Sequence, residues 1–259
     1  MNNTIDHPED MDQQQLSALL ADMLHRMTVH ETLWFREVEH QLGMDNALEI
    51  MDEAWTATRD ISKRRLHEAS ASLIPAVIPS DPGAIPSDTL LLLLDMTAKN
   101  WLAQDGVWFQ AVEKRFGMND AKRCNDSTWG RFSVFEAASV KKLLHLEEHP
   151  GLSGLERALN FRLYGRLNKQ SCRYDDTGAL IFTMDRCRVQ AARKRKQLPD
   201  YPCKSAGLVE YSRFAAGIDN RIMTECICCP PDEHPAEYDC GWRFYLASSE
   251  AHVIMHKFL

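Results

Sequence analysis

The sequence predicts an α+β protein, with an N-terminal duplicated helical bundle and a C-terminal antiparallel sheet of about four strands covered by helices. Three observations support this class. Apolar residues recur at spacings of three and four over residues 16–66, which is typical of amphipathic helices. A similar pattern returns 74 residues further on. After residue 149 the period changes to two, which favours strands.

The chain is expected to divide into three parts. Residues 1–14 are polar and predict a disordered tail. Residues 15–148 form the helical region and residues 149–259 a cysteine-rich α+β domain. Within the helical region, residues 72–88 contain four prolines and predict an extended connector.

The helical region begins with three predicted helices. The first starts near Leu16 and reaches Met27, and a second contains Leu33 and ends at Gly43 as its C-cap. A third covers residues 47–66. Their apolar residues would face a common core.

Two segments of the helical region share one pattern at a constant offset of 74 residues. The matching pairs are Trp34/Trp108, Val38/Val112, Glu39/Glu113, Gly43/Gly117 and Trp55/Trp129. We interpret this as an internal duplication of a unit of roughly three helices, with repeats at about 16–71 and 89–148 that pack as a pseudo-symmetric bundle. The four tryptophans are expected to pack between the repeats, and Trp34 and Trp108 are also candidate ligand-binding residues. Glu39 and Glu113 could bind a metal together, or pair with basic residues on the helix surface.

The C-terminal domain has the signals of a sheet with two helices. Alternation over residues 159–167 predicts a strand that continues to Tyr174. A turn at 175–178 returns the chain as a hairpin. The remaining predicted elements are helices at 187–197 and 206–216, with Gly217 as a C-cap, and strands at 222–228 and 242–246.

Composition excludes some classes of function. A formal net charge of -7 argues against a nucleic-acid-binding protein, whose affinity depends on neutralising phosphates. The N-terminus lacks the features of a secretory signal, and the longest apolar run, at 90–94, is too short to span a bilayer. We therefore expect a cytoplasmic protein that does not enter a membrane. In a reducing compartment, its eight cysteines point to metal ligation, redox chemistry or burial.

Cysteines of the C-terminal domain form the first candidate site. Cys226 and Cys229 have the spacing at which two thiolates share one metal, and Cys240 and Cys203 could complete the set. His234 lies in the loop between Cys229 and Cys240 and is another possible ligand. Thiolates favour zinc or iron over magnesium or calcium. Burial of the cysteines as small apolar side chains is an alternative of equal weight.

The second candidate site is a thiol nucleophile. Cys187 begins a predicted helix, where the helix dipole and Arg188 are expected to lower its pKa. The other members of this site would be Gln190 and Arg193, which could hold a substrate carboxylate, and Glu210 and Tyr211 as acid–base groups. An ordinary amphipathic helix with a buried cysteine is the alternative.

Four motifs carry a family resemblance: Cys187-Arg-Val-Gln-Ala-Ala-Arg193, Tyr201-Pro-Cys-Lys-Ser-Ala-Gly207, Cys226-x-x-Cys229-Pro-Pro-Asp232 and Cys240-x-Trp-x-Phe244. With these motifs the chain resembles a family of prokaryotic cytosolic proteins to which no activity has been assigned. More distantly, its C-terminal half looks like the L-2-amino-thiazoline-4-carboxylate hydrolases and the vinyl-reductase-type small-molecule-binding domains. That likeness implies hydrolysis of a small thiazoline or amide.

Three hypotheses of function follow. The first is a small-molecule-binding protein with a pocket between the helical repeat and the cysteine-bearing sheet, in which the cysteines either line the pocket or hold a transition metal. The second is a hydrolase with Cys187 or Cys226 as nucleophile. The third is a non-catalytic scaffold in which the duplicated helices form a homodimer.

Overall fold

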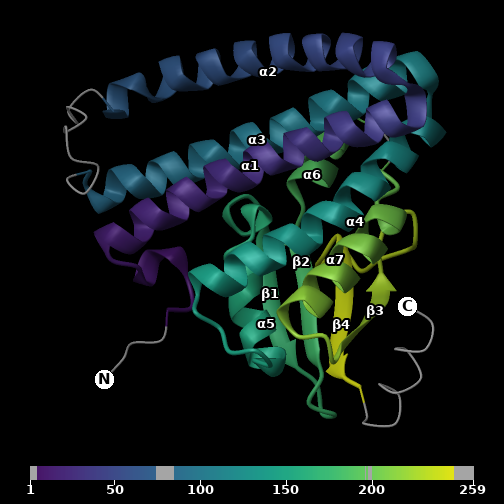
Figure 1. The fold of residues 1–259 in the computed structure, drawn as a ribbon. Helices are drawn as coiled ribbons and strands as arrows, with labels where there is room; N and C mark the ends of the chain where they lie inside the picture. Colours follow the sequence, from purple (N-terminus) through teal and green to yellow (C-terminus); the bar gives the residue numbers. More distant parts are fainter. Residues whose placement is uncertain (1–4, 74–84, 196, 198–199, 248–259) are drawn as a thin grey trace. The chain divides into compact units, whose positions relative to one another are not determined.

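The computed structural model describes residues 5–73, 85–195, 197 and 200–247 (Figure 1). It confirms the predicted α+β class, because long helices precede a four-stranded antiparallel sheet. The chain forms two compact units, Met1–Phe132 and Ser133–Leu259. The boundary lies inside helix α4 (Met118–Leu143), upstream of the position at 148 that the sequence indicated.

The first unit is built from long helices. It contains η1 (Pro8–Asp10), α1 (Gln13–Leu42), α2 (Met44–Leu73), α3 (Ser87–Phe116) and the first part of α4. Helix α2 packs on α1 and α3, which also pack on each other (Figure 1). The prediction of two helices before Gly43 was wrong, and α1 is continuous because residues 28–32 contain neither glycine nor proline.

The start of α1 is fixed by a capping box. The Asp12 side chain accepts a hydrogen bond from the Gln15 amide at 2.8 Å, and the Gln15 side chain accepts one from the Asp12 amide at 2.9 Å. The 3-10 helix η1 lies just before this cap, within the segment for which the sequence indicated a disordered tail. Most of the predicted connector at 72–88 lies outside the described residues.

A single glycine joins α1 to α2, and another joins α3 to α4. Gly43 and Gly117 have φ angles of 91° and 85°, and each donates its amide to a glutamate carbonyl one turn earlier. Each glycine carbonyl then accepts a hydrogen bond from the first turn of the next helix. The bounds of α1 and α3, and the starts of α2 and α4, thus follow the offset of the sequence pattern. Common descent of the two halves stays a prediction.

Aromatic side chains fill the core of this unit. Trp34 and Trp108 stack with ring centroids 6.2 Å apart, and the Trp34 indole donates to Asp105 at 2.8 Å. Both indoles are fully buried, so neither offers a face to a ligand as the sequence had suggested. The fully buried His30 accepts a hydrogen bond from the Trp101 indole at 3.1 Å. Trp55, in contrast, is 56% exposed, and its predicted place in the core was wrong.

The second unit contains the rest of α4 and a mixed sequence of short elements. These are α5 (Gly151–Asn160), η3 (Leu163–Arg166), β1 (Lys169–Tyr174), β2 (Leu180–Arg186), α6 (Arg188–Arg195), α7 (Lys204–Ile218), β3 (Ile222–Cys228) and β4 (Cys240–Leu246). The strands are antiparallel in the order β1-β2-β4-β3. Helices α5 and α7 lie on one face of this sheet, where α5 contacts β4 and α7 contacts β3 (Figure 1).

Two local predictions in this unit were wrong. The strand predicted at 159–167 is the end of α5 followed by η3, because Leu155 and Leu159 bury one face of a helix. Gly217 does not cap α7 but lies inside it, where a Cβ atom would come within 2.6 Å of the Ala137 Cβ atom. The predicted hairpin is confirmed, with Gly178 at a φ of 79° in its turn.

Candidate functional site

Four thiols from separate elements approach one another in the second unit. Cys203 precedes α7, Cys229 follows β3, and their sulfur atoms are 3.5 Å apart. The Cys229 thiol also makes a hydrogen bond with Cys240, which begins β4. Cys187 precedes α6 and interacts electrostatically with Cys203 and Cys240. We call these four residues the thiol cluster.

The N-terminus of α7 positions two of these thiols. The Lys204 amide donates to the Pro230 carbonyl at 2.9 Å, and the Lys204 ammonium forms an ion pair with Asp232 at 2.7 Å. Gly207, one turn into α7, lies against β4, and a Cβ atom there would come within 2.8 Å of the Trp242 ring. The same position would be 3.6 Å from the Cys229 sulfur. Glycine therefore allows α7 to approach the sheet at the cluster.

Gln190 holds the loop that carries Cys203. Its side-chain amide donates to the Tyr201 carbonyl and its oxygen accepts from the Tyr201 amide, both at 2.9 Å. The same nitrogen lies 3.6 Å from the Cys203 sulfur. Both ends of the buried Gln190 amide are thus engaged, and we assign it a structural role in place of the predicted substrate contact. Arg193 is half-buried on α6.

Two thiols of the cluster, Cys187 and Cys229, have a raised pKa. The pKa of Cys187 is raised to about 12, first by burial and then by Cys240 and Cys203. Hydrogen bonds from the backbone at Gln190 and Val189 oppose this rise but do not outweigh it. The predicted lowering of the Cys187 pKa was therefore wrong. The pKa of Cys229 is also raised far above its ordinary value, mainly by its contact with Cys203.

Two further predicted metal ligands, and one cysteine next to them, have partners outside the thiol cluster. Cys226 on β3 interacts with Lys204 and Asp232, and burial raises its pKa to about 11. The adjacent Cys228 forms a hydrogen bond with Tyr238. The predicted ligand His234 lies 3.5 Å from Asp200. Within the described ranges, no three histidine, cysteine, aspartate or glutamate side chains already surround a position for a metal ion. The predicted pair Glu39 and Glu113 therefore does not belong to such a group either.

The two predicted acid–base residues lie beside the cluster in a buried ionic network. Arg162 donates to Glu136 at 2.9 Å and to Glu210 at 2.7 Å. Burial raises the pKa of Glu210 despite this cation. Tyr211 stacks on Trp242 with centroids 4.6 Å apart. Burial, followed by the charges of Cys240 and Glu210, raises the pKa of Tyr211 well above its ordinary value.

Arg162 and Glu136 were not found by the sequence analysis, although a signal was present. Arg162 stands between two apolar residues, Phe161 and Leu163. Glu136 lies one turn after the buried Phe132 and one turn before the buried Val140. A charged residue on a buried face must find a partner, which predicts an internal ion pair.

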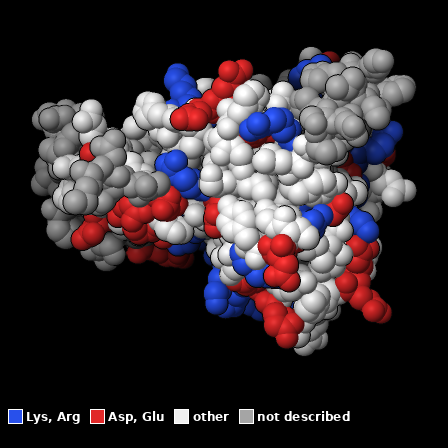
Figure 2. Space-filling view, turned by 90° about the horizontal axis from the view of Figure 1, so that it is seen from below, with Lys and Arg blue, Asp and Glu red and all other residues white. Residues whose placement is uncertain are grey.

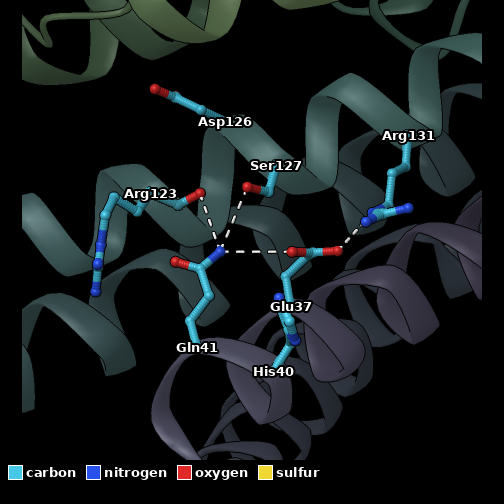
Figure 3. Close-up of a pocket in the computed structure, with 7 residues that line it drawn as sticks. All are labelled: Glu37, His40, Gln41, Arg123, Asp126, Ser127 and Arg131. Atoms are coloured by element: carbon cyan, nitrogen blue, oxygen red, sulfur yellow. Dashed lines mark hydrogen bonds and ion pairs between the residues drawn. The ribbon is translucent and has the colours of Figure 1, made fainter.

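A separate pocket of about 540 Å³ lies in the first unit, between α1 and α4 (Figure 3). Its lining residues are Glu37, His40, Gln41, Arg123, Asp126, Ser127 and Arg131. The buried Glu37 carboxylate accepts from Arg131 at 2.6 Å and from Arg36 at 2.9 Å. Gln41 points toward the same carboxylate and toward α4 (Figure 3). Because ligand pockets usually have apolar walls, we interpret this set as a polar network that joins the two helices.

No described helix is both long and apolar enough to cross a membrane. On the face drawn in Figure 2, acidic and basic side chains are interspersed. An interspersed distribution does not produce the one-sign field that attracts a polyanion.

Together the fold and site define an α+β protein that combines long N-terminal helices with a partly buried thiol cluster beside an antiparallel sheet. The chain belongs to the family of unknown function DUF6125, whose model matches residues 9–75 and 84–246. The matched range includes all four residues of the thiol cluster. No curated protein and no solved structure matches the chain. The distant likeness to thiazoline hydrolases and vinyl-reductase-type domains therefore stays a prediction.

Proposed function

We propose that this protein binds a small molecule through a transition-metal ion, zinc in the first place, held by Cys203, Cys229 and Cys240. The fourth position on the metal would accept a donor atom of the small molecule, with Cys187 close enough to compete for it. The observation that carries this proposal is the 3.5 Å contact between the Cys203 and Cys229 sulfur atoms.

The sulfur spacing supports the proposal. Two thiolates on one tetrahedral zinc ion lie about 3.8 Å apart, because each zinc–sulfur bond is about 2.3 Å long. The Cys203–Cys229 distance of 3.5 Å is close to this value, and Cys240 contacts the same thiol. In the described part of the chain, the thiols contact one another and do not yet enclose a metal. Binding would require them to lose protons and rotate about their Cα–Cβ bonds.

The electrostatics of the cluster favour a cation. Burial and the neighbouring thiols raise the pKa of Cys187 and Cys229, and the attraction of Lys194 for Cys187 and of Lys204 for Cys229 supplies too little positive charge to offset this rise. A divalent cation would supply that charge. Metal affinity should consequently rise with pH as the competition from protons weakens.

The same pKa shifts argue against a metal-free thiol hydrolase. The nucleophile in such an enzyme is the thiolate, which must be present near neutral pH. Burial raises the pKa of Cys187 to about 12 and that of Cys226 to about 11. Both thiols would remain protonated.

Titration of the reduced, untagged protein with Co²⁺ tests the proposal. Sulfur-to-cobalt charge transfer and the d–d bands report thiolate number and tetrahedral geometry, and competition with a chromophoric chelator gives the zinc stoichiometry and affinity. We expect one ion per chain. Cys229→Ser should weaken zinc binding by more than about tenfold. Cys172→Ser, which removes a thiol on β1 outside the cluster, is the matched control and should leave binding unchanged.

The Cys187→Ser variant assigns the fourth position. An unchanged cobalt spectrum and affinity would leave that position to a small molecule, whereas loss of one charge-transfer contribution would identify Cys187 as the fourth ligand and contradict the open site. Absence of stoichiometric binding at micromolar protein, or wild-type affinity in a folded Cys229→Ser protein, would reject the metal site altogether.

A further inference from the structure

Helix α2 presents an apolar line to solvent. Met44, Leu48, Met51 and Trp55 follow one another at spacings of four, three and four, which places them on one face of the helix. Leu66 lies 11 residues after Trp55, about three turns further along the same face of the helix. The exposed fractions of these five residues range from 38% to 56%. We call these five residues the α2 stripe.

The matching part of α4 is covered. Trp129, at the position that corresponds to Trp55, is buried against the rings of His30, Trp101 and Phe132. Trp55 keeps more than half of its surface exposed. An exposed tryptophan in an apolar line is unusual on a monomer and marks a site of association.

The charges of α2 are distributed so that the helix is complementary to itself. Residues 44–55 contain four acidic and no basic residues, whereas residues 56–68 contain four basic and two acidic ones. On the exposed surface beside the stripe, Asp45 and Asp52 represent the first half and Arg59 and Lys63 the second. When a twofold axis relates two copies so that their α2 helices are antiparallel, the acidic half of each helix faces the basic half of the other.

We propose that the α2 stripe is the interface of a homodimer, in which the α2 helices of two copies pack antiparallel with Trp55 near the twofold axis. Trp55 suits this place because it is midway between Met44 and Leu66 in the chain. A parallel arrangement would oppose like charges along the helix. Charge complementarity therefore selects a second copy in the antiparallel orientation.

The size of the stripe is sufficient for a modest interface. Helix α2 has 30 residues, and a helix of this length spans about 45 Å. Large apolar side chains that are half exposed can each bury roughly 100 Å² more. Five such residues from each copy, with the aliphatic stems of the flanking charged residues, approach the roughly 1,200 Å² of a small specific interface.

Light scattering coupled to size-exclusion chromatography, repeated over a range of concentrations, tests the interface. We expect the wild-type protein to be a dimer that dissociates on dilution, with a red shift of tryptophan emission as Trp55 becomes hydrated. Trp55→Glu should give a monomer at every concentration. Leu24→Glu, which changes an exposed leucine of α1, is the matched control and should remain dimeric. A wild-type monomer at high concentration, or a dimeric Trp55→Glu protein, would overturn the proposal.

Charge reversal tests the orientation. The variant with Asp45→Lys and Asp52→Lys would oppose basic halves, and the variant with Arg59→Glu and Lys63→Glu would oppose acidic halves. Each should be a monomer alone, and an equimolar mixture should form a heterodimer. Dimers of either variant alone, or a mixture that stays monomeric, would contradict antiparallel packing. Since the thiol cluster takes no part in these measurements, their outcome is separate from that of the metal proposal.

Discussion

Replacement of Arg162 by methionine should destabilise the second unit more than any change to a surface ion pair. Arg162 is 3% exposed and bridges Glu136 and Glu210, of which Glu136 is almost fully buried. Its guanidinium also lies over the Phe214 ring at 4.6 Å. Arg162→Met keeps most of the aliphatic volume but leaves two buried carboxyl groups without a cation.

The expected loss of unfolding free energy follows from the two buried carboxyl groups that no cation compensates. Removing one partner of a buried ion pair costs about 3–5 kcal/mol, because the remaining charge is buried without compensation. In the variant, the pKa of the Glu210 carboxyl group, which burial already raises, should therefore lie further above that of the unfolded chain. Below the pKa of the unfolded chain, the carboxyl group is protonated in both the folded and the unfolded state, and this loss of stability is absent. It grows as the pH rises toward the folded pKa, by about 1.4 kcal/mol per pH unit for each proton.

Urea-induced unfolding, followed by near-ultraviolet circular dichroism at about pH 5 and about pH 8, measures the effect. We expect the loss of unfolding free energy to be larger at the higher pH. Arg243→Met is the matched control, because Arg243 also bridges two carboxylates, Asp175 and Glu225, but is partly exposed. It should lose no more than about 1 kcal/mol. Equal losses in the two variants, or a loss for Arg162→Met that does not change with pH, would refute the reasoning.

Two further substitutions test the packing of each unit. Burial lowers the pKa of His30 to about 3, so below about pH 6.5 only the unfolded chain takes up this proton, and wild-type stability should fall by about 1.4 kcal/mol per pH unit. In His30→Gln this pH-dependent loss of stability should be absent. Urea midpoints of both proteins at about pH 5 and about pH 7 measure it. An identical pH dependence in the two proteins would contradict a neutral buried imidazole. Gly217→Ala should lower the melting temperature through a clash with Ala137 that costs about 1–3 kcal/mol. Adding Ala137→Gly should recover part of this loss, and the absence of any recovery would place the cause elsewhere.

The sequence predicted most elements whose signals are local. Helical spacing, the turn at Gly178 and the strand at 222–228 depend on neighbouring residues, and the structure confirms them. The strand predicted at 159–167 failed because Leu159 and Leu163 fit both periods, and the helix that starts before them decided the outcome. The position of Gly217 depended on contact with α4, which a local pattern does not contain.

Prediction of the site was also limited, because the contacts between distant elements are not contained in a local sequence pattern. The sequence indicated which cysteines were candidates, but docking of α7 against β4 determines that Cys203 meets Cys229 while Cys226 interacts with Lys204. The helix start at Cys187 suggested a low pKa, whereas burial, which depends on tertiary structure, raises it. Arg162 was missed because its two carboxylate partners come from distant parts of the chain.

The one-residue joints of the first unit have a consequence for how this protein tolerates mutation. Gly43 and Gly117 are exposed, and a side chain at either position would meet no atom within 4 Å. Their backbone angles nevertheless belong to a region that residues with a Cβ atom rarely enter. In a saturation library both codons should therefore be nearly invariant, although a map based on solvent accessibility would rank them among the most permissive sites.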